Sequence, residues 1–402
     1  MERRSLHAVL LSGVTDATRL IGPLAKALDG TGPAILPLDA GLPAARLGTL
    51  LGAFRPDVVV GVAGDATVRS GGQGTAPDTA VVVGTSGSTG EPKGVELSAA
   101  ALLHSARASL ARVGALPGER WLCCLPVTHV AGLQVLVRSL AAGSEPAVAA
   151  HADAGALAGS GAAHVSVVPT QLARLLADPA GTAALAGFSS VLVGGAAAPE
   201  GLLARARAAG IAAVTTYGMT ETCGGCVYDG VPLDGVRVRA GEDGLLRISG
   251  PVLMNRYFGG ADLDVEFVTS DLGTVSPDGR VTVRGRADDV INTGGHKVVP
   301  GEVAAALESC PGVREVVVIG RPDLEWGERV TAVVVPEDPV DPPSLELLRM
   351  HVRERLPRYA SPSEVVLTEA IPVLPSGKPD LASLRKARTL RGREHSPLRS
   401  VN

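Results

Sequence analysis

The stretch "VVVGTSGSTGEPKGVELS", residues 81–98, packs four glycines, four hydroxyl side chains and one lysine into residues 84–94. An apolar β-branched run leads into it, and a helical segment begins soon after Ser98. A loop between a strand and a helix can turn backbone N–H groups and hydroxyls toward a phosphate. The stretch therefore predicts an anion-binding loop.

Three other interpretations of this loop fit less well. A P-loop needs Gly, four residues and then Gly-Lys-Ser/Thr, but here Glu91 and Pro92 follow Gly90, and Gly94 follows Lys93. The dinucleotide spacing G-x-G-x-x-G is absent from the loop. A flexible Ser/Gly linker is disfavoured because a predicted strand and helix flank the loop closely.

Composition limits the class of protein. The chain has 402 residues, which suggests two or three domains, and its net charge of −4 gives no basic field for nucleic acid. No apolar run reaches the roughly 18 residues that a membrane span requires. The N-terminal "HAVLLSG" is interpreted as a first strand rather than a signal peptide, so a cytoplasmic location is expected.

The cysteines do not suggest a disulfide framework. There are five of them, an odd number, and only Cys223 and Cys226 form a CxxC pair. A second pair at zinc spacing is missing, so metal or redox use of this pair is the minor alternative.

The chain predicts an α/β fold followed by a smaller α+β domain. Between residue 7 and about residue 250, apolar runs such as "AVVVG", "HVSVVP" and "SVLVGG" alternate with Ala/Leu-rich helical segments, which favours largely parallel sheets. Beyond Arg280, "RVTVRGRADDVI" suggests a hairpin. A helix from Pro300, two strands, a helix from Leu345 with Ser344 as its N-cap, another strand and a turn at "VLPSGKPD" follow. The predicted domains are 1–285 and 286–388, with a disordered tail at 389–402.

Seven motifs in order resemble the adenylate-forming superfamily, which includes acyl-CoA synthetases, peptide-synthetase adenylation domains and luciferases. Together they cover roughly residues 80–385. In longer members the glycine-rich loop lies much further from the N-terminus, so the resemblance implies a trimmed N-terminal subdomain. After "TSGSTGEPKG" the motifs are "LPVTHVAGL" (125–133), "GGA" (194–196), "TYGMTE" (216–221), "SDLG" (270–273), "GRADDVINTGG" (285–295) and "PSGKPD" (375–380).

The resemblance implies an enzyme that joins a carboxylate to the α-phosphate of ATP, expels pyrophosphate and then passes the acyl group to a thiol. Tyr217 would lie against the adenine, Thr220 would contact the α-phosphate, Glu221 would bind Mg²⁺, and Asp271 would hold the ribose. Other expected nucleotide contacts are Thr85, Ser86, Ser88, Thr89 and Lys93 at the β- and γ-phosphates, with Gly195 and Thr216 beside the nucleotide.

The small domain would supply mobile groups. By resemblance, Lys378 bridges the substrate carboxylate and the α-phosphate during adenylation, and Arg286 is a second ribose contact. Asp288 is the hinge about which the small domain turns between the two steps. Gly294, Gly295 and Lys297 would line the route by which coenzyme A enters.

The acid substrate is expected to lack an α-amine, because no Asp or Glu occurs between Leu125 and Arg138. Residues 125–143 and 216–238 resemble the short o-succinylbenzoate–CoA ligases of actinobacterial menaquinone synthesis. Arg138 would then neutralise the second carboxylate of a diacid, its alternative being a snorkelling side chain. His129 would gate the acyl pocket, or be an ordinary core histidine; Gly218 and Gly224 would also line the acid site.

The expected substrates are thus a small carboxylic acid, ATP with Mg²⁺, and coenzyme A, with a homodimer as a possible assembly and with neither nucleic acid nor a membrane span. Three alternatives stay open: a ligase for another aryl or medium-chain acid, an enzyme that loads a carrier-protein thiol, and a nucleotide-binding protein without catalysis. The joint presence of Glu221, Asp271, Arg286 and Lys378 argues against the last.

Overall fold

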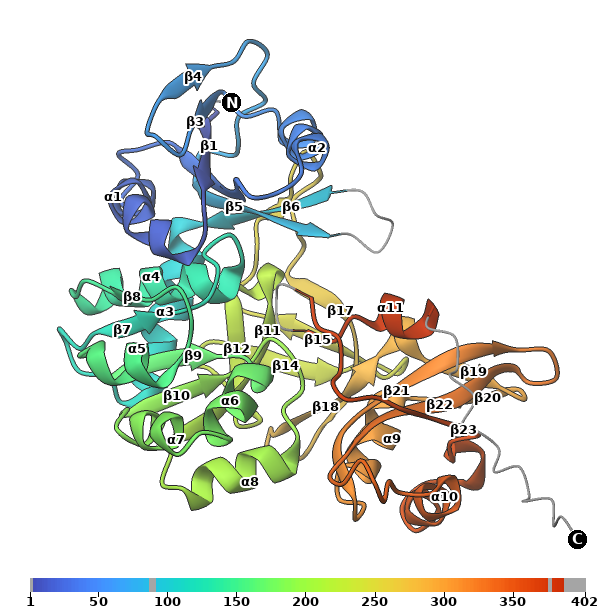
Figure 1. The fold of residues 1–402 in the computed structure, drawn as a ribbon. Helices are drawn as coiled ribbons and strands as arrows, with labels where there is room; N and C mark the ends of the chain where they lie inside the picture. Colours follow the sequence, from blue (N-terminus) through green and yellow to red (C-terminus); the bar gives the residue numbers. More distant parts are fainter. Residues whose placement is uncertain (1–2, 87–91, 375–377, 387–402) are drawn as a thin grey trace, which may run out of the picture. The chain divides into compact units, whose positions relative to one another are not determined.

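The computed structural model describes residues 3–86, 92–374 and 378–386. The chain forms two compact units, Met1–Val283 and Arg284–Asn402, and each is described by itself (Figure 1). The predicted tail at 389–402 lies outside the described residues, and the functional division at residue 285 stays a prediction. No helix in the described part of the chain is long and apolar enough to cross a bilayer.

The first sheet of unit 1 carries the glycine-rich loop. Its strand order is β16-β6-β5-β2-β1-β3-β4, with β1, β2, β3 and β5 parallel and β6 antiparallel to β5. The helices α1 (Ala17–Leu28) and α2 (Ala44–Phe54) pack on it in two separate apolar clusters. The strands are β1 (Leu6–Leu11), β2 (Ala34–Asp39), β3 (Val58–Val60), β4 (Ala66–Val68), β5 (Thr79–Ser86), β6 (Pro92–Ser98) and β16 (Arg256–Tyr257).

The loop's setting differs from the prediction. The segment after it is not the approach to a helix but the strand β6, which returns antiparallel to β5 from Pro92 opposite Ser86. The helix predicted after Ser98 is confirmed as α3 (Ala99–Val113), and the Ser98 hydroxyl caps it by accepting a hydrogen bond from the N–H of Ala101. The described residues on either side of the loop's centre therefore belong to two paired antiparallel strands.

The second sheet has the order β13-β12-β11-β10-β9-β7-β8. The helices α3 and α4 (Val130–Ala142) share one apolar core with both this sheet and the first. The opposite face is covered by α5 (Ala154–Gly159), α6 (Pro169–Leu176), α7 (Pro179–Ala186) and α8 (Glu200–Ala208) (Figure 1). The strands are β7 (Trp121–Cys123), β8 (Ala147–Val148), β9 (His164–Val167), β10 (Ser190–Val193), β11 (Ala213–Met219), β12 (Gly224–Tyr228) and β13 (Val231–Pro232).

A third, antiparallel sheet was missed by the sequence analysis. Its order is β14-β15-β17-β18, with β14 (Arg237–Ala240), β15 (Leu245–Ser249), β17 (Glu266–Val275) and β18 (Val281–Arg286). The two inner strands alternate buried and partly exposed residues, as in β15, where Leu246 and Ile248 are buried, and in the second half of β17. A sheet covered on one face has this period-two pattern, which lacks the continuous apolar runs that marked the other strands.

Unit 2 is the small α+β domain. Its strands are β19 (Ile291–Thr293), β20 (His296–Val298), β21 (Val313–Asp323), β22 (Gly327–Pro336) and β23 (Glu364–Leu367). Its helices are α9 (Pro300–Leu307), α10 (Leu345–Arg353) and α11 (Leu381–Lys386). The hydroxyl of Ser344 caps α10 as predicted, by accepting from the N–H of Leu347.

The hairpin predicted at residues 280–291 is wrong. β18 belongs to the third sheet beside β17, whereas β19 pairs with β20 and β22. The 3-10 turn η3 (Ala287–Asp289) separates the two strands. The fold class itself is confirmed: a large domain of layered α/β subdomains and a small α+β domain.

Candidate active site

The predicted site residues divide between the two units. Unit 1 holds those assigned to the acid and, except for Arg286, those assigned to the nucleotide. Unit 2 holds Arg286 and the residues assigned to the hinge, the thiol and the catalytic lysine. Of the loop residues, Ser88 and Thr89 lie outside the described residues.

The ends of the β5–β6 hairpin bring Thr85 and Lys93 together. The two residues are cross-strand partners, and the Thr85 hydroxyl donates to the Lys93 carbonyl at 3.2 Å. Ser86 is the last residue of β5. The Lys93 ammonium lies over the ring of Tyr257, 5.7 Å from its centroid. The loop's one cation is thus held beside a second segment of the chain.

Close backbone packing explains the glycines of the motifs at 194–196 and 216–224. A Cβ on Gly218 would lie 2.0 Å from the carbonyl oxygen of Gly224, and one on Gly194 would lie 2.1 Å from the hydroxyl of Thr216. Gly195 and Gly224 have φ of +83° and +95°, a region that L side chains rarely adopt. These positions allow β10, β11 and β12 to approach one another at the ends that carry the site.

Tyr217 on β11 and Asp271 on β17 meet directly. The phenol of Tyr217 donates to the carboxylate of Asp271 at 2.7 Å. Burial raises the pKa of Tyr217, and the charge of Asp271 raises it further. Asp271 lies within β17 and is only 8% exposed. The residues expected at adenine and ribose are therefore neighbours, with the phenol kept protonated.

Glu221 follows β11 in the 3-10 turn η2 (Thr220–Thr222). Its carboxylate accepts a hydrogen bond from the hydroxyl of Tyr257 at 2.9 Å. Sequence reasoning missed Tyr257. The chain has only four tyrosines, and two of them, Tyr217 and Tyr257, donate to predicted site carboxylates. Their scarcity was the signal that could have found it.

His129 is the N-cap residue of α4 and is exposed, which excludes its alternative as a core histidine. Further along α4, the amide nitrogen of Gln134 donates to the carbonyl of Cys223 at 2.8 Å. A Cβ on Gly224 would lie 3.3 Å from the Gln134 side chain and 3.7 Å from that of Val130. The first turns of α4 thus pack against the start of β12, beside two of the predicted acid-site residues.

Arg138, also on α4, is 5% exposed. Its guanidinium lies over the ring of Trp121, 4.2 Å from the centroid, and donates to the hydroxyl of Ser166 at 2.8 Å. Burial lowers the pKa of Arg138, an effect that the phenol of Tyr228 opposes. No carboxylate of the described residues pairs with it, and its Nε has no hydrogen-bond partner there. Snorkelling is excluded, because a snorkelling head group would reach water.

In unit 2, the guanidinium of Arg286 donates to the carboxylate of Asp288 at 2.9 Å, so the predicted ribose and hinge residues are joined. Gly294 and Gly295 form the two-residue turn between β19 and β20, with φ of +56° and +81°. Both values are those that a type I′ hairpin turn requires. Lys297 follows on β20 and is exposed.

Lys378 lies at the base of the predicted "PSGKPD" turn. Val373 and Pro379 form an isolated antiparallel bridge, and the N–H of Leu374 donates to the Lys378 carbonyl at 2.8 Å. The Lys378 side chain is exposed. The backbone of the lysine is thus fixed by a short hairpin.

The CxxC pair is buried. Burial raises the pKa of Cys226 to about 12, and also raises the pKa of Cys223, which lies close to it. Thiolates are the metal ligands and nucleophiles, so these thiols are in the wrong protonation state for either role. Within residues 3–86, 92–374 and 378–386, no group of three metal-ligating side chains converges.

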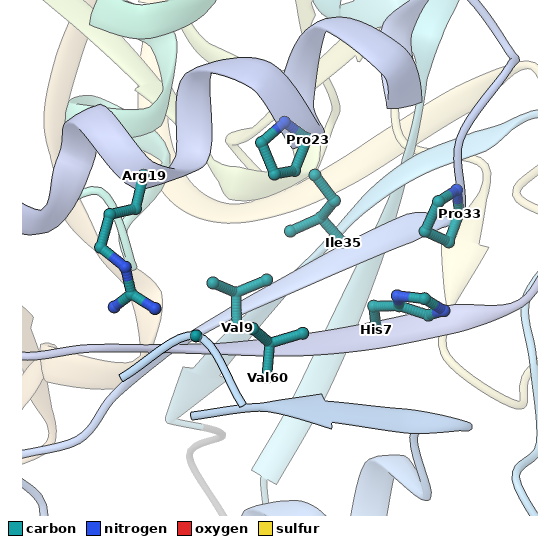
Figure 2. Close-up of a pocket in the computed structure, with 8 residues that line it drawn as sticks. His7, Val9, Arg19, Pro23, Pro33, Ile35 and Val60 are labelled. Carbon is teal, nitrogen blue, oxygen red and sulfur yellow. The ribbon is translucent and has the colours of Figure 1, made fainter. Parts of the chain in front are cut away.

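A pocket of about 270 Å³ lies under α1, away from these residues (Figure 2). Its walls include Val9, Ile35 and Val60, with His7 and Arg19 also lining it. The Arg19 guanidinium already donates to the carbonyls of Leu10 and Gly61, at 3.2 and 2.7 Å. The described lining of this pocket includes no predicted site residue.

Comparison with known proteins agrees with the motifs. Residues 63–246 match the AMP-binding enzyme family, and residues 302–378 match the AMP-binding enzyme C-terminal domain. A probable 2-succinylbenzoate–CoA ligase of Mycobacterium tuberculosis is 44% identical over 95% of this chain and 97% of its own. A feruloyl-CoA synthase of Amycolatopsis is 34% identical over 75% of this chain and 68% of its own.

Among solved structures, the o-succinylbenzoate CoA synthetase of Bacillus subtilis, in complex with its acyl-adenylate intermediate, superimposes with a TM-score of 0.77. It is 25% identical, over 97% of this chain and 90% of that one. ATP-bound MatB of Rhodopseudomonas palustris shares the fold, with a TM-score of 0.80 at 24% identity over 96% and 89% of the two chains. The chain belongs to the AMP-binding enzyme family.

Proposed function

We propose that the protein is a 2-succinylbenzoate–CoA ligase, which converts this diacid, ATP and coenzyme A to the acyl-CoA, AMP and pyrophosphate through an acyl-adenylate. Family membership makes it an ATP-dependent, AMP-forming acid–CoA ligase. The choice of acid is carried by Arg138, a buried cation on α4 without a carboxylate partner among the described residues.

The first step brings a carboxylate to a triphosphate, so its main requirement is cations and donors placed in advance. Lys93 and the hydroxyls of the glycine-rich loop bind the β- and γ-phosphates. Tyr217 and Asp271 hold the adenosine, and their mutual hydrogen bond fixes the geometry of both. Thr220 contacts the α-phosphate.

A divalent cation fits this site. Glu221 is a single carboxylate with one oxygen engaged by Tyr257, and Mg²⁺ is commonly bound by one or two carboxylates together with phosphate oxygens and waters. When bound, the cation neutralises charge on the phosphate oxygens. The protein's own part is to hold the Glu221 carboxylate in one orientation.

The residues of unit 2 act by changing place between the two steps. Lys378 delivers a cation to the reacting carboxylate and α-phosphate, and then leaves so that a thiol can enter. Rotation is centred on Asp288, and Arg286 contacts the ribose. Gly294, Gly295 and Lys297 line the path of coenzyme A, where the two glycines permit close approach of its chain.

Arg138 meets the carboxylate that does not react. It lies nine residues after His129, which corresponds to roughly 13 Å along the helix, and helical side chains lean toward the N-terminus of their helix. Its guanidinium lies between the Trp121 ring and the Ser166 hydroxyl and close to the phenol of Tyr228. Tyr228 is at the far end of β12 from Gly224, so the unreacted carboxylate has to extend along β12 to this end. A carboxylate transferred from water to a buried site needs such a partner, because its desolvation costs several kcal/mol.

The second candidate is a ligase for another aryl acid, which the similarity to feruloyl-CoA synthase favours. In that case Arg138 would not meet a second carboxylate. The carrier-protein acceptor stays an alternative, and the cytoplasmic location and the possible homodimer stay predictions.

The test compares 2-succinylbenzoate with 4-oxo-4-phenylbutanoate, which lacks only the ring carboxylate, in an assay for pyrophosphate release with ATP and coenzyme A. We expect kcat/KM for the diacid to be higher by about 10–10³-fold, on the scale of a charge-assisted contact. Equal values for the two acids would refute the choice of substrate. Failure of both acids, with activity on ferulate, would support the second candidate.

The role of Lys378 is tested by separating the half-reactions. Lys378→Ala should lower the rate of adenylation by about 10²–10³-fold, the effect of removing one preorganised contact to a transition state, and should leave thioester formation from supplied acyl-adenylate largely intact. Equal losses in both steps would contradict the two-state role.

A further inference from the structure

Tyr257 lies where the two nucleotide-binding segments of unit 1 are tied together. Its strand β16 pairs antiparallel with β6, with Tyr257 opposite Val95. Just before β16, the N–H of Met254 donates to the carbonyl of Glu221 at 2.8 Å. Residues 254–257 are therefore bonded on one side to the strand that carries Lys93 and on the other to the turn that carries Glu221.

The Tyr257 side chain makes the same connection a second time. Its hydroxyl donates to Oε1 of Glu221 at 2.9 Å, while its ring lies under the Lys93 ammonium, 5.7 Å from ring centroid to Nζ. A cation within about 6 Å of a ring face is attracted by the ring quadrupole. One side chain thus contacts both the proposed metal-binding carboxylate and the proposed phosphate-binding cation.

The hydrogen bond runs from the phenol to Glu221, because a carboxylate oxygen only accepts. One oxygen of Glu221 is oriented by this bond, which leaves the other oxygen for a cation.

We infer that Tyr257 is a positioning residue that couples divalent-metal binding to ATP binding, its hydroxyl orienting Glu221 and its ring supporting Lys93. This inference rests on the proposed function, because it assumes that the site takes ATP with a divalent cation. The two parts of the side chain have different roles: the hydroxyl orients the carboxylate that binds the metal, and the ring supports the lysine that binds the phosphates.

The test measures the dissociation constant of radiolabelled ATP by equilibrium dialysis, once with saturating Mn²⁺ and once with EDTA, for the wild type, Tyr257→Phe and Tyr257→Leu. The ratio of the dissociation constant with EDTA to that with Mn²⁺ measures how much the metal strengthens ATP binding, and it requires no catalysis. Tyr257→Phe should lower this ratio by about ten-fold, the scale of a hydrogen bond to a charged group, and leave metal-free binding within about two-fold. Tyr257→Leu should lower the ratio equally and also weaken metal-free binding by about 2–5-fold.

The matched control is Asp262→Asn, which breaks the 2.8 Å ion pair between Asp262 and Arg256. Arg256 precedes Tyr257 on β16. Asp262→Asn should keep both constants within about two-fold of wild type. A wild-type ratio in Tyr257→Phe, or an equal fall in the ratio of Asp262→Asn, would overturn the inference while leaving the proposed function standing. A wild-type protein that binds no ATP under either condition would overturn both.

Discussion

Two buried arginines, one in each unit, are held in opposite ways. Arg138 in unit 1 and Arg321 in unit 2 are 5% and 8% exposed. Arg321 lies 3.5 Å from the carboxylate of Glu364, which also accepts from the hydroxyl of Thr331, and it donates to the carbonyl of Leu384. Arg138 has an aromatic ring, a serine hydroxyl and a nearby phenol, but no carboxylate among the described residues.

The difference separates a structural charge from one that is ready for a ligand. A buried cation is costly unless an anion compensates it. In unit 2 the chain itself supplies the anion, so Arg321 holds strands and the helix α11 together. Near Arg138 the described chain supplies no carboxylate but a ring, a hydroxyl and a phenol, and under the proposed function the second carboxylate of the substrate compensates its charge.

The largest effect is expected on stability in unit 2. Arg321→Met leaves the half-buried carboxylate of Glu364 without this cation and should destabilise the protein by about 3 kcal/mol, measured by urea unfolding. The double variant Arg321→Met/Glu364→Gln should recover most of this loss, because no charge then remains unpaired. A loss under about 1 kcal/mol in the single variant would show that Arg321 does not carry a structural ion pair.

Arg138→Leu should have the opposite signature. We expect KM for 2-succinylbenzoate to rise about 10–10³-fold, or about 1.5–4 kcal/mol, with the free energy of unfolding unchanged or increased, since an unpaired buried charge is removed. KM for 4-oxo-4-phenylbutanoate should be unchanged or lower. A parallel rise for both acids, together with a loss of stability, would make Arg138 structural like Arg321.

A smaller effect on KM is expected from removing the Ser166 hydroxyl, which accepts a hydrogen bond from Arg138. Ser166→Ala removes the 2.8 Å hydrogen bond and should raise KM for the diacid by about ten-fold, the scale of about 1.5 kcal/mol for a bond to a charged group. Steady-state kinetics with both acids measures this. Ser190→Ala is the control, because Ser190 bonds His164 rather than Arg138; if it had the same effect, the hydroxyl of Ser166 would have no specific role.

The smallest effect is expected in the chemical labelling of Cys123, the thiol close to Arg138. Burial raises the pKa of Cys123 to about 11, although the Arg138 charge lowers it. Only the thiolate reacts with Ellman's reagent, and the thiolate fraction grows only as the pH approaches 11. Cys123 should therefore stay unlabelled in the native protein at pH 8 and react after unfolding. Rapid native labelling of Cys123, located by mass spectrometry, would show that the Arg138 environment is open to solvent.

Sequence alone predicted the strands that are buried on both faces, such as β9 and β10, because their apolar runs are continuous. The strand β6 was missed, because "GVELS" is short and contains Glu96, a residue type usually found at the surface. In the structure Glu96 is buried and its carboxylate accepts a hydrogen bond from the hydroxyl of Thr79. The motifs singled out Tyr217, Asp271 and Glu221, whereas only the scarcity of tyrosines pointed to Tyr257, and its partners could not be predicted. Its role depends on β16 joining β6, a pairing between residues about 160 positions apart that no local pattern encodes.

That pairing also sets an order of events during synthesis. Until β16 has left the ribosome, one edge of β6 has no partner in the sheet, and unpaired edges invite aggregation. At roughly 5–20 residues per second, the edge stays open for about 8–30 s. Lys93 has no ring beneath it over most of this interval, whereas Glu221, made 36 residues before Tyr257, lacks its phenol for only about 2–7 s. If Tyr257 supports the site as inferred, nucleotide adds full stability to the nascent N-terminal half only after the chain has passed Tyr257.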